Sequence, residues 1–237
     1  MDNFKYDILN DFIEIKELQI SQLTSFFKLL QESNLQYNLT KIIEFDDVVK
    51  KHYYDSLIFT KEIKLLDQKI IDVGSGAGFP GIVLKICFPN LKVFLLESNG
   101  KKANFLKGVI LKLKLKDIFV INDRSESLSI IMKENFDIVV SRAMAPLNIL
   151  LELTAQLINI GGTLIALKGK NFEKELEDLN KKNSMLGLDW WKTQKVYIEG
   201  IGHRVNIFYK KINRTPNIFP RSYSVVKKKP LGWKEKE

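Results

Sequence analysis

Four closely spaced glycines follow a short apolar segment in this 237-residue chain. They are Gly74, Gly76, Gly78 and Gly81. The segment before them, Lys69 to Val73, has the composition of a buried strand, and a helical pattern begins at Pro80, a residue that the first helical turn tolerates. Glycines at this spacing let the backbone approach a ligand where any Cβ would clash, and they accept positive φ at a strand-to-helix turn. The segment therefore predicts a loop that binds a nucleotide-like cofactor.

Two cofactor classes fit this loop. Gly76 to Gly81 satisfies the G-x-G-x-x-G pattern of dinucleotide-binding proteins. Read from Asp72, the same loop is an acid followed by alternating glycines, the signature of S-adenosylmethionine-dependent methyltransferases. The first glycine directly follows the strand, which favours the second interpretation. Charge favours it too, because Asp72 would repel a pyrophosphate and attract the ammonium or sulfonium group of S-adenosylmethionine.

Polar side chains follow the next two strands. Glu97 comes directly after the predicted strand 92–96, about 20 residues beyond the loop, where an acid can hold ribose hydroxyls. Both cofactor classes use such an acid, so Glu97 indicates a nucleoside without choosing between them. Ser125 and Glu126 follow the third strand, from which side chains can reach an adenine. They also suit the start of a helix, and both interpretations stay open.

Two cations follow the fourth and fifth strands. Arg142 comes shortly after the apolar run 136–140, in a chain with only five arginines. Its guanidinium can bind the carboxylate of the cofactor with two hydrogen bonds or donate to an exocyclic oxygen of a base, and the alternative is a surface ion pair. Lys168 ends the fifth strand and faces the same crevice, because ligands of parallel sheets lie outside the carboxyl ends of the strands. We expect Arg142 and Lys168 to be the catalytic residues.

The elements that position these residues alternate between strands and helices. The predicted strands are 69–73, 92–96, 117–121, 136–140 and 162–167, and the predicted helices between them are about 80–88, 99–114, 126–134 and 146–159. This alternation predicts a mostly parallel sheet with helices on both faces. Together with the methyltransferase signature that begins at Asp72, we expect an α/β, Rossmann-like class I methyltransferase fold. Gly200 and Gly202 separate two later runs, 195–198 and 204–209, which predicts an antiparallel hairpin at the sheet edge.

Three regions are expected along the chain. Residues 1–66 have helical spacing and form an N-terminal helical layer, residues 67–212 form the methyltransferase core, and residues 213–237 form an irregular, proline-containing tail. From Arg204 to Glu237 there are ten Lys or Arg and two Glu, in a chain of formal net charge +9. Such clustering suits a phosphate-binding surface, although a lysine-rich tail that only aids solubility would have the same composition.

Composition excludes several classes of protein. No segment has the ~20 uninterrupted apolar residues of a membrane span, and the N-terminus lacks a secretory pattern. Cys87 is the only cysteine and there are two histidines, so neither a disulfide framework nor a metal site is expected. We expect a cytoplasmic, monomeric protein that contacts no membrane and needs no metal.

Several separated blocks share their order and spacing with one family. They are Tyr37–Thr40, His52–Leu57, Asp72–Gly81, Lys101–Leu106, Ser141–Ala143, Ala166–Gly169 and, in the tail, Phe219–Arg221 with Lys229–Leu231. In these blocks the chain resembles the bacterial small-subunit ribosomal RNA guanine-N-7 methyltransferases, the glucose-inhibited division protein B family. The match spans roughly residues 20–232.

The resemblance implies methyl transfer from S-adenosylmethionine to the position-7 nitrogen of a guanine in small-subunit ribosomal RNA, either free or within the subunit. It implies cofactor contacts at Gly74, Phe79, Ser125, Glu126 and Arg142, with Glu97, Ser98 and Asn99 at the ribose, and Gly76 and Gly78 complete the expected cofactor loop. The RNA contacts are expected at Lys101, Lys102, Arg204 and Arg221. Lys102 stands where arginine is common in the family and Phe79 where leucine is common, and both keep the charge or the bulk.

The implied acceptor suits a site without a strong base. The position-7 nitrogen of guanine has an in-plane lone pair and no proton to lose, so alignment and electrostatics carry the reaction. Two alternatives remain, namely a methyltransferase of the same fold that acts on a small molecule or protein, and a nicotinamide-dependent oxidoreductase. The basic tail and the blocks outside the loop disfavour the first alternative, and Asp72 disfavours the second.

Overall fold

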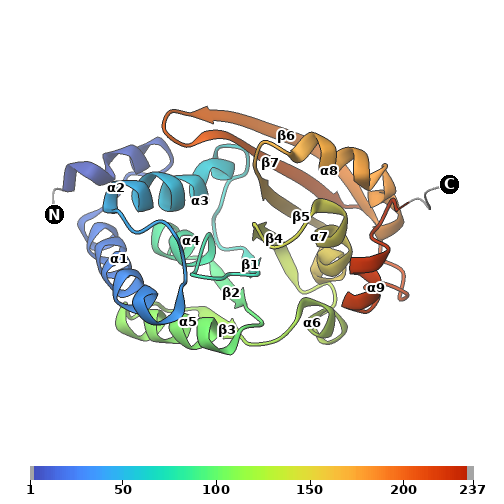
Figure 1. Ribbon diagram of the computed structural model, residues 1–237, viewed down its shortest axis with the longest axis horizontal. Helices are drawn as coiled ribbons and strands as arrows, with labels where there is room; N and C mark the ends of the chain where they lie inside the picture. The colour runs from blue at the N-terminus through green and yellow to red at the C-terminus, as the bar shows by residue number, and fades with distance from the viewer. Residues whose placement is uncertain (1–2, 234–237) are drawn as a thin grey trace. The chain divides into compact units, whose positions relative to one another are not determined.

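The computed structural model describes residues 3–233, which form two compact units (Figure 1). The first unit runs to Asn122 and the second begins at Asp123. Residues 1–2 and 234–237, the outermost parts of the expected helical layer and tail, lie outside the described residues. Among residues 3–233, no helix is long and apolar enough to cross a membrane.

The first unit begins with helices, as the spacing of its apolar residues predicts. They are η1 (Asn3–Asp11), α1 (Glu17–Tyr37) and a continuous helical segment made of α2 (Phe45–Val48), η2 (Val49–Tyr54), α3 (Asp55–Leu57) and η3 (Ile58–Lys61). Leu23, Phe26, Phe27 and Leu30 form the buried face of α1. The η2 turn is a π-helix, an irregularity that often lies next to functional sites.

Three parallel strands follow in the first unit, in the order β3-β2-β1. They are β1 (Lys69–Val73), β2 (Lys92–Leu96) and β3 (Ile118–Ile121), connected by α4 (Gly81–Cys87) and α5 (Gly100–Lys112). Val73 pairs with Leu96, and Leu96 pairs with Ile121. The carboxyl ends of the three strands are therefore level, which brings the glycine loop beside Glu97.

The second unit contains four strands in the order β4-β5-β7-β6. The parallel pair is β4 (Phe136–Arg142) with β5 (Ile158–Lys168), and the antiparallel hairpin is β6 (Leu188–Ile198) with β7 (Gly202–Lys211). The helices are α6 (Ser125–Ile131), α7 (Leu147–Thr154), η4 (Ala155–Leu157), α8 (Phe172–Leu179), η5 (Lys182–Leu186) and α9 (Tyr223–Lys228). The hairpin was predicted, but β6 begins at Leu188, well before the predicted start at Lys195, because it pairs along the whole of β7.

The tail is more ordered than its prolines predict. It contains the short helix α9 (Figure 1). Val226 of this helix is fully buried and packs in one cluster with Ile149 and Leu153 of α7. Lys211 at the end of β7 is also fully buried, and its Nζ donates to the carbonyls of Ala155 (2.8 Å) and Leu186 (3.0 Å). Burial lowers the pKa of Lys211 to about 8. The expectation of an irregular tail is therefore wrong at α9, because tertiary packing stabilises a helix that is too short to form alone.

Cys87 is buried at the end of α4, and burial raises the pKa of its thiol to about 12. The thiolate is the reactive form, so the native protein is expected to react with a thiol-specific reagent at pH 8 at least about 100-fold more slowly than the unfolded chain. Timed labelling with and without urea measures the ratio. Equal rates in both conditions would contradict the burial of this thiol.

Candidate active site

The glycine loop after β1 has the backbone conformation that the sequence predicts. Gly74, Gly76 and Gly78 all have positive φ, between 56° and 98°. A Cβ on Gly78 would lie 2.7 Å from the Ile82 side chain, so this position requires glycine for space as well as for conformation. A Cβ on Gly76 would approach nothing nearer than 3.8 Å among the described residues. The loop therefore leaves open space over Gly76 in which a ligand can approach its backbone.

Asp72 holds the two ends of this loop together. Its side chain is fully buried, and its Oδ2 accepts a hydrogen bond of 3.0 Å from the backbone N–H of Gly81. A Cβ on Gly81 would lie 2.2 Å from the Leu95 side chain and 2.9 Å from Asp72 Oδ2. The acid thus fixes the start of α4 against the end of β1. The negative charge of Asp72 can attract a cationic ligand electrostatically from a distance. Because the carboxylate is fully buried, it is not exposed for direct contact with a ligand.

Glu97 connects the loop to the start of α5. Its Oε2 accepts a hydrogen bond of 2.8 Å from Gly76 N–H, and its Oε1 accepts one of 2.7 Å from Asn99 N–H. Asn99 in turn caps α5, because its Oδ1 accepts from the N–H groups of Lys101 (3.0 Å) and Lys102 (3.2 Å). Each carboxylate oxygen has more than one acceptor site, so Glu97 can shape the loop and still accept from ribose hydroxyls.

Phe79 lies beneath the loop and is only 5% exposed. Its ring stacks on His52 of η2 with a centroid distance of 4.3 Å, and it lies 5.3 Å from the ring of Phe26 of α1. His52 Nε2 is within hydrogen-bonding distance, 3.0 Å, of Thr40 Oγ1. His52, which Thr40 contacts, thus packs against the glycine loop at the ring of Phe79. A cofactor contact at this residue would come from its backbone, since the ring faces the helices.

In the second unit, the ends of β4 and β5 bring two expected residues close together. Arg142 is the last residue of β4 and pairs with Leu167, directly before Lys168. Ala143 has a left-handed conformation (φ 54°), so the chain turns immediately after Arg142. The two cations therefore lie at the same end of neighbouring strands, as the parallel sheet predicts.

Lys168 is held by an ion pair. Its Nζ lies 2.7 Å from Glu175 Oε2 of α8 and donates to the carbonyl of Ala145 (2.6 Å). Burial lowers the pKa of Lys168, and the hydrogen bond to Glu175 opposes this shift. Glu175 also accepts from the N–H of Leu147 at the start of α7. These contacts position the loop after β4, and they engage the ammonium group that the sequence suggests for catalysis.

The start of α6 differs from the capping interpretation of its sequence. Ser125 is buried, and its hydroxyl donates to the carbonyl of Leu153 (2.8 Å) instead of capping the helix. The residue at the N-cap position is Arg124, which makes no capping hydrogen bond through its side chain. The guanidinium of Arg124 lies 3.9 Å from Glu126. Ser125 thus anchors α6 to α7, and a contact from it to a cofactor would come from its backbone.

The four expected RNA-binding residues have different surroundings. Lys101 and Lys102 open α5, and Arg204 lies on β7, where its Nη1 donates to the carbonyl of His203 (3.0 Å). Arg221 instead forms two hydrogen bonds to the fully buried Glu152 of α7, from Nε (2.7 Å) and Nη2 (2.5 Å). This pair holds the tail against α7, so it gives Arg221 a structural role that sequence spacing could not reveal.

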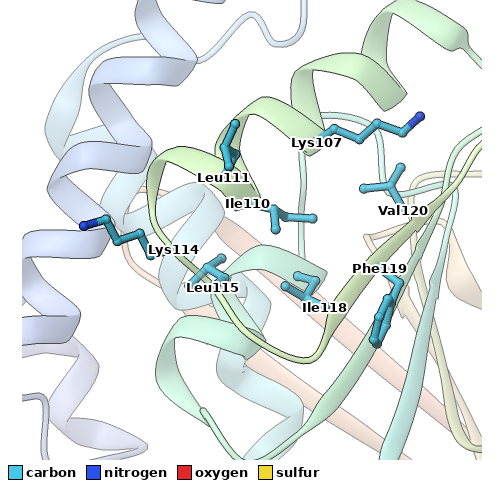
Figure 2. A pocket seen from close by; sticks show the side chains of 8 residues that line it. All are labelled: Lys107, Ile110, Leu111, Lys114, Leu115, Ile118, Phe119 and Val120. Atoms are coloured by element: carbon cyan, nitrogen blue, oxygen red, sulfur yellow. The ribbon is translucent and has the colours of Figure 1, made fainter.

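A second basic cluster lies outside the tail. Residues 101–116 contain six lysines and no acid, in α5 and the turn after it. This segment forms a groove of about 510 Å³ with β3. In Figure 2, Lys107 and Lys114 point in opposite directions, and Ile110, Leu115 and Ile118 lie between them. The six lysines without an acid can be read from the sequence, but a charge count restricted to residues 204–237 does not include them.

Solved structures show the same fold. A SAM dependent methyltransferase from Aquifex aeolicus aligns with 75% of this chain and 96% of its own, with a TM-score of 0.55 and 17% identity. M. jannaschii TYW2 in complex with AdoMet aligns with 73% of this chain and 80% of its own, with a TM-score of 0.53 and 17% identity. The fold is that of the class I S-adenosylmethionine-dependent methyltransferases.

The sequence comparisons define the family. Residues 19–199 match the model of the family GidB, rRNA small subunit methyltransferase G, and the chain belongs to this family. The relatives named ribosomal RNA small subunit methyltransferase G include those of Mycoplasma capricolum, 47% identical over 92% of this chain and 96% of its own, and Mesoplasma florum, 44% identical over 92% and 91%. The predicted fold, family and methyl donor are confirmed, and the dinucleotide interpretation of the loop is not supported.

The tail ion pair makes a testable contribution to stability. Replacing Arg221 with alanine leaves the carboxylate of Glu152 buried without its cation, so we expect the free energy of unfolding to fall by about 3 kcal/mol. Urea titration followed by circular dichroism measures the change. The exposed Lys227 of α9 provides the control, because Lys227→Ala should change stability by less than about 0.5 kcal/mol. If Arg221→Ala weakened RNA binding at unchanged stability, Arg221 would be an RNA contact instead.

Proposed function

We propose that this enzyme methylates the position-7 nitrogen of a guanine in small-subunit ribosomal RNA. The family match over residues 19–199 carries this proposal, and the relatives' names supply the substrate class. The acceptor suits the chemistry of the site residues, because position 7 needs no deprotonation before attack. Lys168, the one lysine among the expected catalytic residues, is already engaged by Glu175 and is poorly placed to act as a free base.

The first unit fits S-adenosylmethionine at the glycine loop. We propose that the backbone of Gly74, Gly76 and Gly78 receives the amino-acid part of the cofactor and that Glu97, with Ser98 and Asn99, receives the ribose. The open space over Gly76 and the orientation of the Glu97 carboxylate support this assignment. When bound, S-adenosylmethionine supplies an electrophilic methyl group on a sulfonium.

The second unit would supply the adenine contact and the catalytic cation. We propose that the backbone of Ser125 and the side chain of Glu126 border the adenine, and that Arg142 either binds the carboxylate of the cofactor or donates to the exocyclic oxygen of the guanine. Lys168 would act as a positioning residue through Glu175 and Ala145. These roles need only alignment and fixed positive charge.

RNA would be held by lysines near the start of α5 and by the second unit. The backbone N–H groups of Lys101 and Lys102 donate to Oδ1 of Asn99, one of the residues proposed to receive the ribose. This position next to the ribose site supports the assignment of both lysines to RNA phosphates. Arg204 remains a candidate on β7. Because the substrate is ribosomal RNA, we propose that the enzyme acts in the cytoplasm, and that it acts as a monomer.

Methyl transfer from labelled S-adenosylmethionine tests the proposal. The purified enzyme is incubated with small-subunit ribosomal RNA, either free or in assembled subunits, and the digested nucleosides are separated. We expect label in 7-methylguanosine, and the more active of the two substrates identifies the natural form. Label in another nucleoside, or in neither RNA preparation, would contradict the proposed acceptor.

A further inference from the structure

The lysines of segment 101–116, which covers α5 and the turn after it, are not neutralised within the first unit. The segment contains six lysines and no acid, and none of the six forms an ion pair or a side-chain hydrogen bond within residues 3–233. The first acid after the segment is Asp117, whose charge acts on Lys85 and opposes the lowering of the Lys85 pKa by burial. The segment therefore keeps a local positive charge that attracts a polyanion.

The same segment and the edge strand β3 line one groove of about 510 Å³. Lys107 and Lys114 belong to its lining and point in opposite directions (Figure 2). Two apolar side chains of the lining are exposed, Leu111 by 79% and Phe119 by 44%. Lysines combined with exposed apolar surface suit a single strand of nucleic acid, which presents phosphates on its backbone and apolar faces on its bases.

Lys114 occupies a position at which glycine is the usual residue. Its N–H donates to the carbonyl of Leu111 (3.2 Å) at the end of α5. The N–H of Leu115 donates to the carbonyl of Ile110 (3.1 Å), and the two bonds together form a Schellman motif. This motif needs a left-handed residue, and Lys114 has φ 51°. A lysine is strained in that conformation and a glycine is not, so the lysine makes this helix end less stable than a glycine would.

Gly108 is the converse case. It lies inside α5, directly after Lys107 and one turn before Leu111, and it is exposed. Its φ is not positive, and a Cβ added there would meet no atom within 4 Å among the described residues. Neither conformation nor packing in the described chain requires a glycine here, although glycine destabilises a helix interior relative to alanine. The missing side chain leaves room for another backbone to approach α5 closely.

We propose that the groove between α5 and β3 binds an unpaired segment of the substrate RNA. The ammonium groups of Lys107 and Lys114 hold its phosphates, and its sugar-phosphate backbone passes over Gly108. Leu111 and Phe119 offer apolar surface to its sugars and bases. The glycine and the lysine that oppose the local backbone preference both belong to this surface, and such departures are expected where residues serve a ligand.

This site extends the RNA contacts beyond those proposed at Lys101 and Lys102. The helix α5 has 13 residues and is therefore about 20 Å long, and it begins directly after Asn99 of the proposed ribose site. RNA in the groove would thus flank the target guanine and would not enter the active site. The inference rests on the proposed function, because it assumes that the substrate is ribosomal RNA.

Binding of the full-length enzyme to transcribed small-subunit ribosomal RNA at several salt concentrations tests the charges. We expect the double variant Lys107→Gln, Lys114→Gln to raise the Kd and KM for RNA about 5- to 20-fold and to reduce the slope of log K against log salt by about 1.5. The Kd for S-adenosylmethionine should stay unchanged. The control Lys28→Gln, Lys64→Gln removes the same charge from two exposed lysines outside the segment and should change the Kd for RNA less than twofold. Equal salt slopes in the two double variants would overturn the inference.

The variants Lys114→Gly and Gly108→Ala test the positions whose residue types oppose the backbone preference. Each substitution suits its local backbone, so we expect the Tm to rise by about 1–3 °C while the Kd for RNA rises at least about threefold. The bulkier Gly108→Leu should weaken RNA binding further without a loss of Tm. A purely structural role would move stability and binding together. Wild-type RNA affinity in both stabilised variants, or a fall in Tm in both, would contradict the proposal.

Assembled subunits distinguish RNA from a protein as the occupant of the groove. If the lysine variants bound subunits poorly but free RNA normally, the groove would contact a ribosomal protein, and the inference would be wrong. If the wild-type enzyme methylates no ribosomal RNA in either form, the proposed function itself fails. Intact methylation with wild-type RNA affinity in all of these variants would remove only this site.

Discussion

Replacing Glu97 with glutamine is expected to raise the Kd of S-adenosylmethionine about 30- to 100-fold. Both carboxylate oxygens of Glu97 accept from backbone N–H groups, one of Gly76 and one of Asn99. A glutamine has one acceptor oxygen, so its amide N–H₂ must face one of these two donors. The loop or the α5 cap then loses a charge-assisted hydrogen bond, which costs roughly 2–3 kcal/mol, and any hydrogen bond to the ribose weakens with it.

Isothermal titration calorimetry of the cofactor with Glu97→Gln measures this effect. Glu97→Asp separates its two causes, because it keeps the charge but cannot reach both amides, so we expect an intermediate Kd. Glu32→Gln on α1 is the control, as that acid is exposed and lies outside the loop. A Kd in Glu97→Gln equal to that of the wild type would show that the carboxylate neither shapes the loop nor meets the ribose.

The sequence predicted the parts of this molecule that depend on local backbone chemistry. The glycines at 74, 76 and 78 have positive φ because the turn after β1 requires it, and that requirement is visible in residue type. The level strand ends followed from the alternation of apolar strands and helices. The glycine turn and the level strand ends together were sufficient to predict that Glu97 lies beside the loop.

The remaining features depend on partners distant in the sequence. Arg221 meets Glu152 and Lys168 meets Glu175, and spacing along the chain gives no sign of either pair. Phe79 was expected at the cofactor, but its ring packs under the loop against His52, because the helical segment before β1 covers that side. Residue type alone does not tell whether a cationic side chain binds a ligand or pairs with a buried acid. Tertiary packing determines which of the two it contacts.

Replacing Arg142 with alanine is expected to lower kcat about 1,000-fold, or roughly 4 kcal/mol in the barrier. Arg142 ends β4 beside Lys168, and the left-handed Ala143 directs the chain away after it. Lys168 cannot easily substitute for it, since Glu175 and the Ala145 carbonyl engage its ammonium group. Arg142→Ala removes from this strand end the guanidinium that is proposed to act in the reaction.

The kinetics of Arg142→Ala distinguish the two roles of the guanidinium. If it binds the carboxylate of the cofactor, the Kd of S-adenosylmethionine rises together with the loss of kcat, and Arg142→Lys recovers little because an ammonium cannot form the paired hydrogen bonds. If it donates to the guanine, kcat falls at unchanged cofactor affinity, and added guanidinium ion restores part of the rate. Lys168→Met provides the contrast, since it should lower stability more than kcat by releasing α8. A wild-type rate for Arg142→Ala at saturating cofactor would remove Arg142 from the active site.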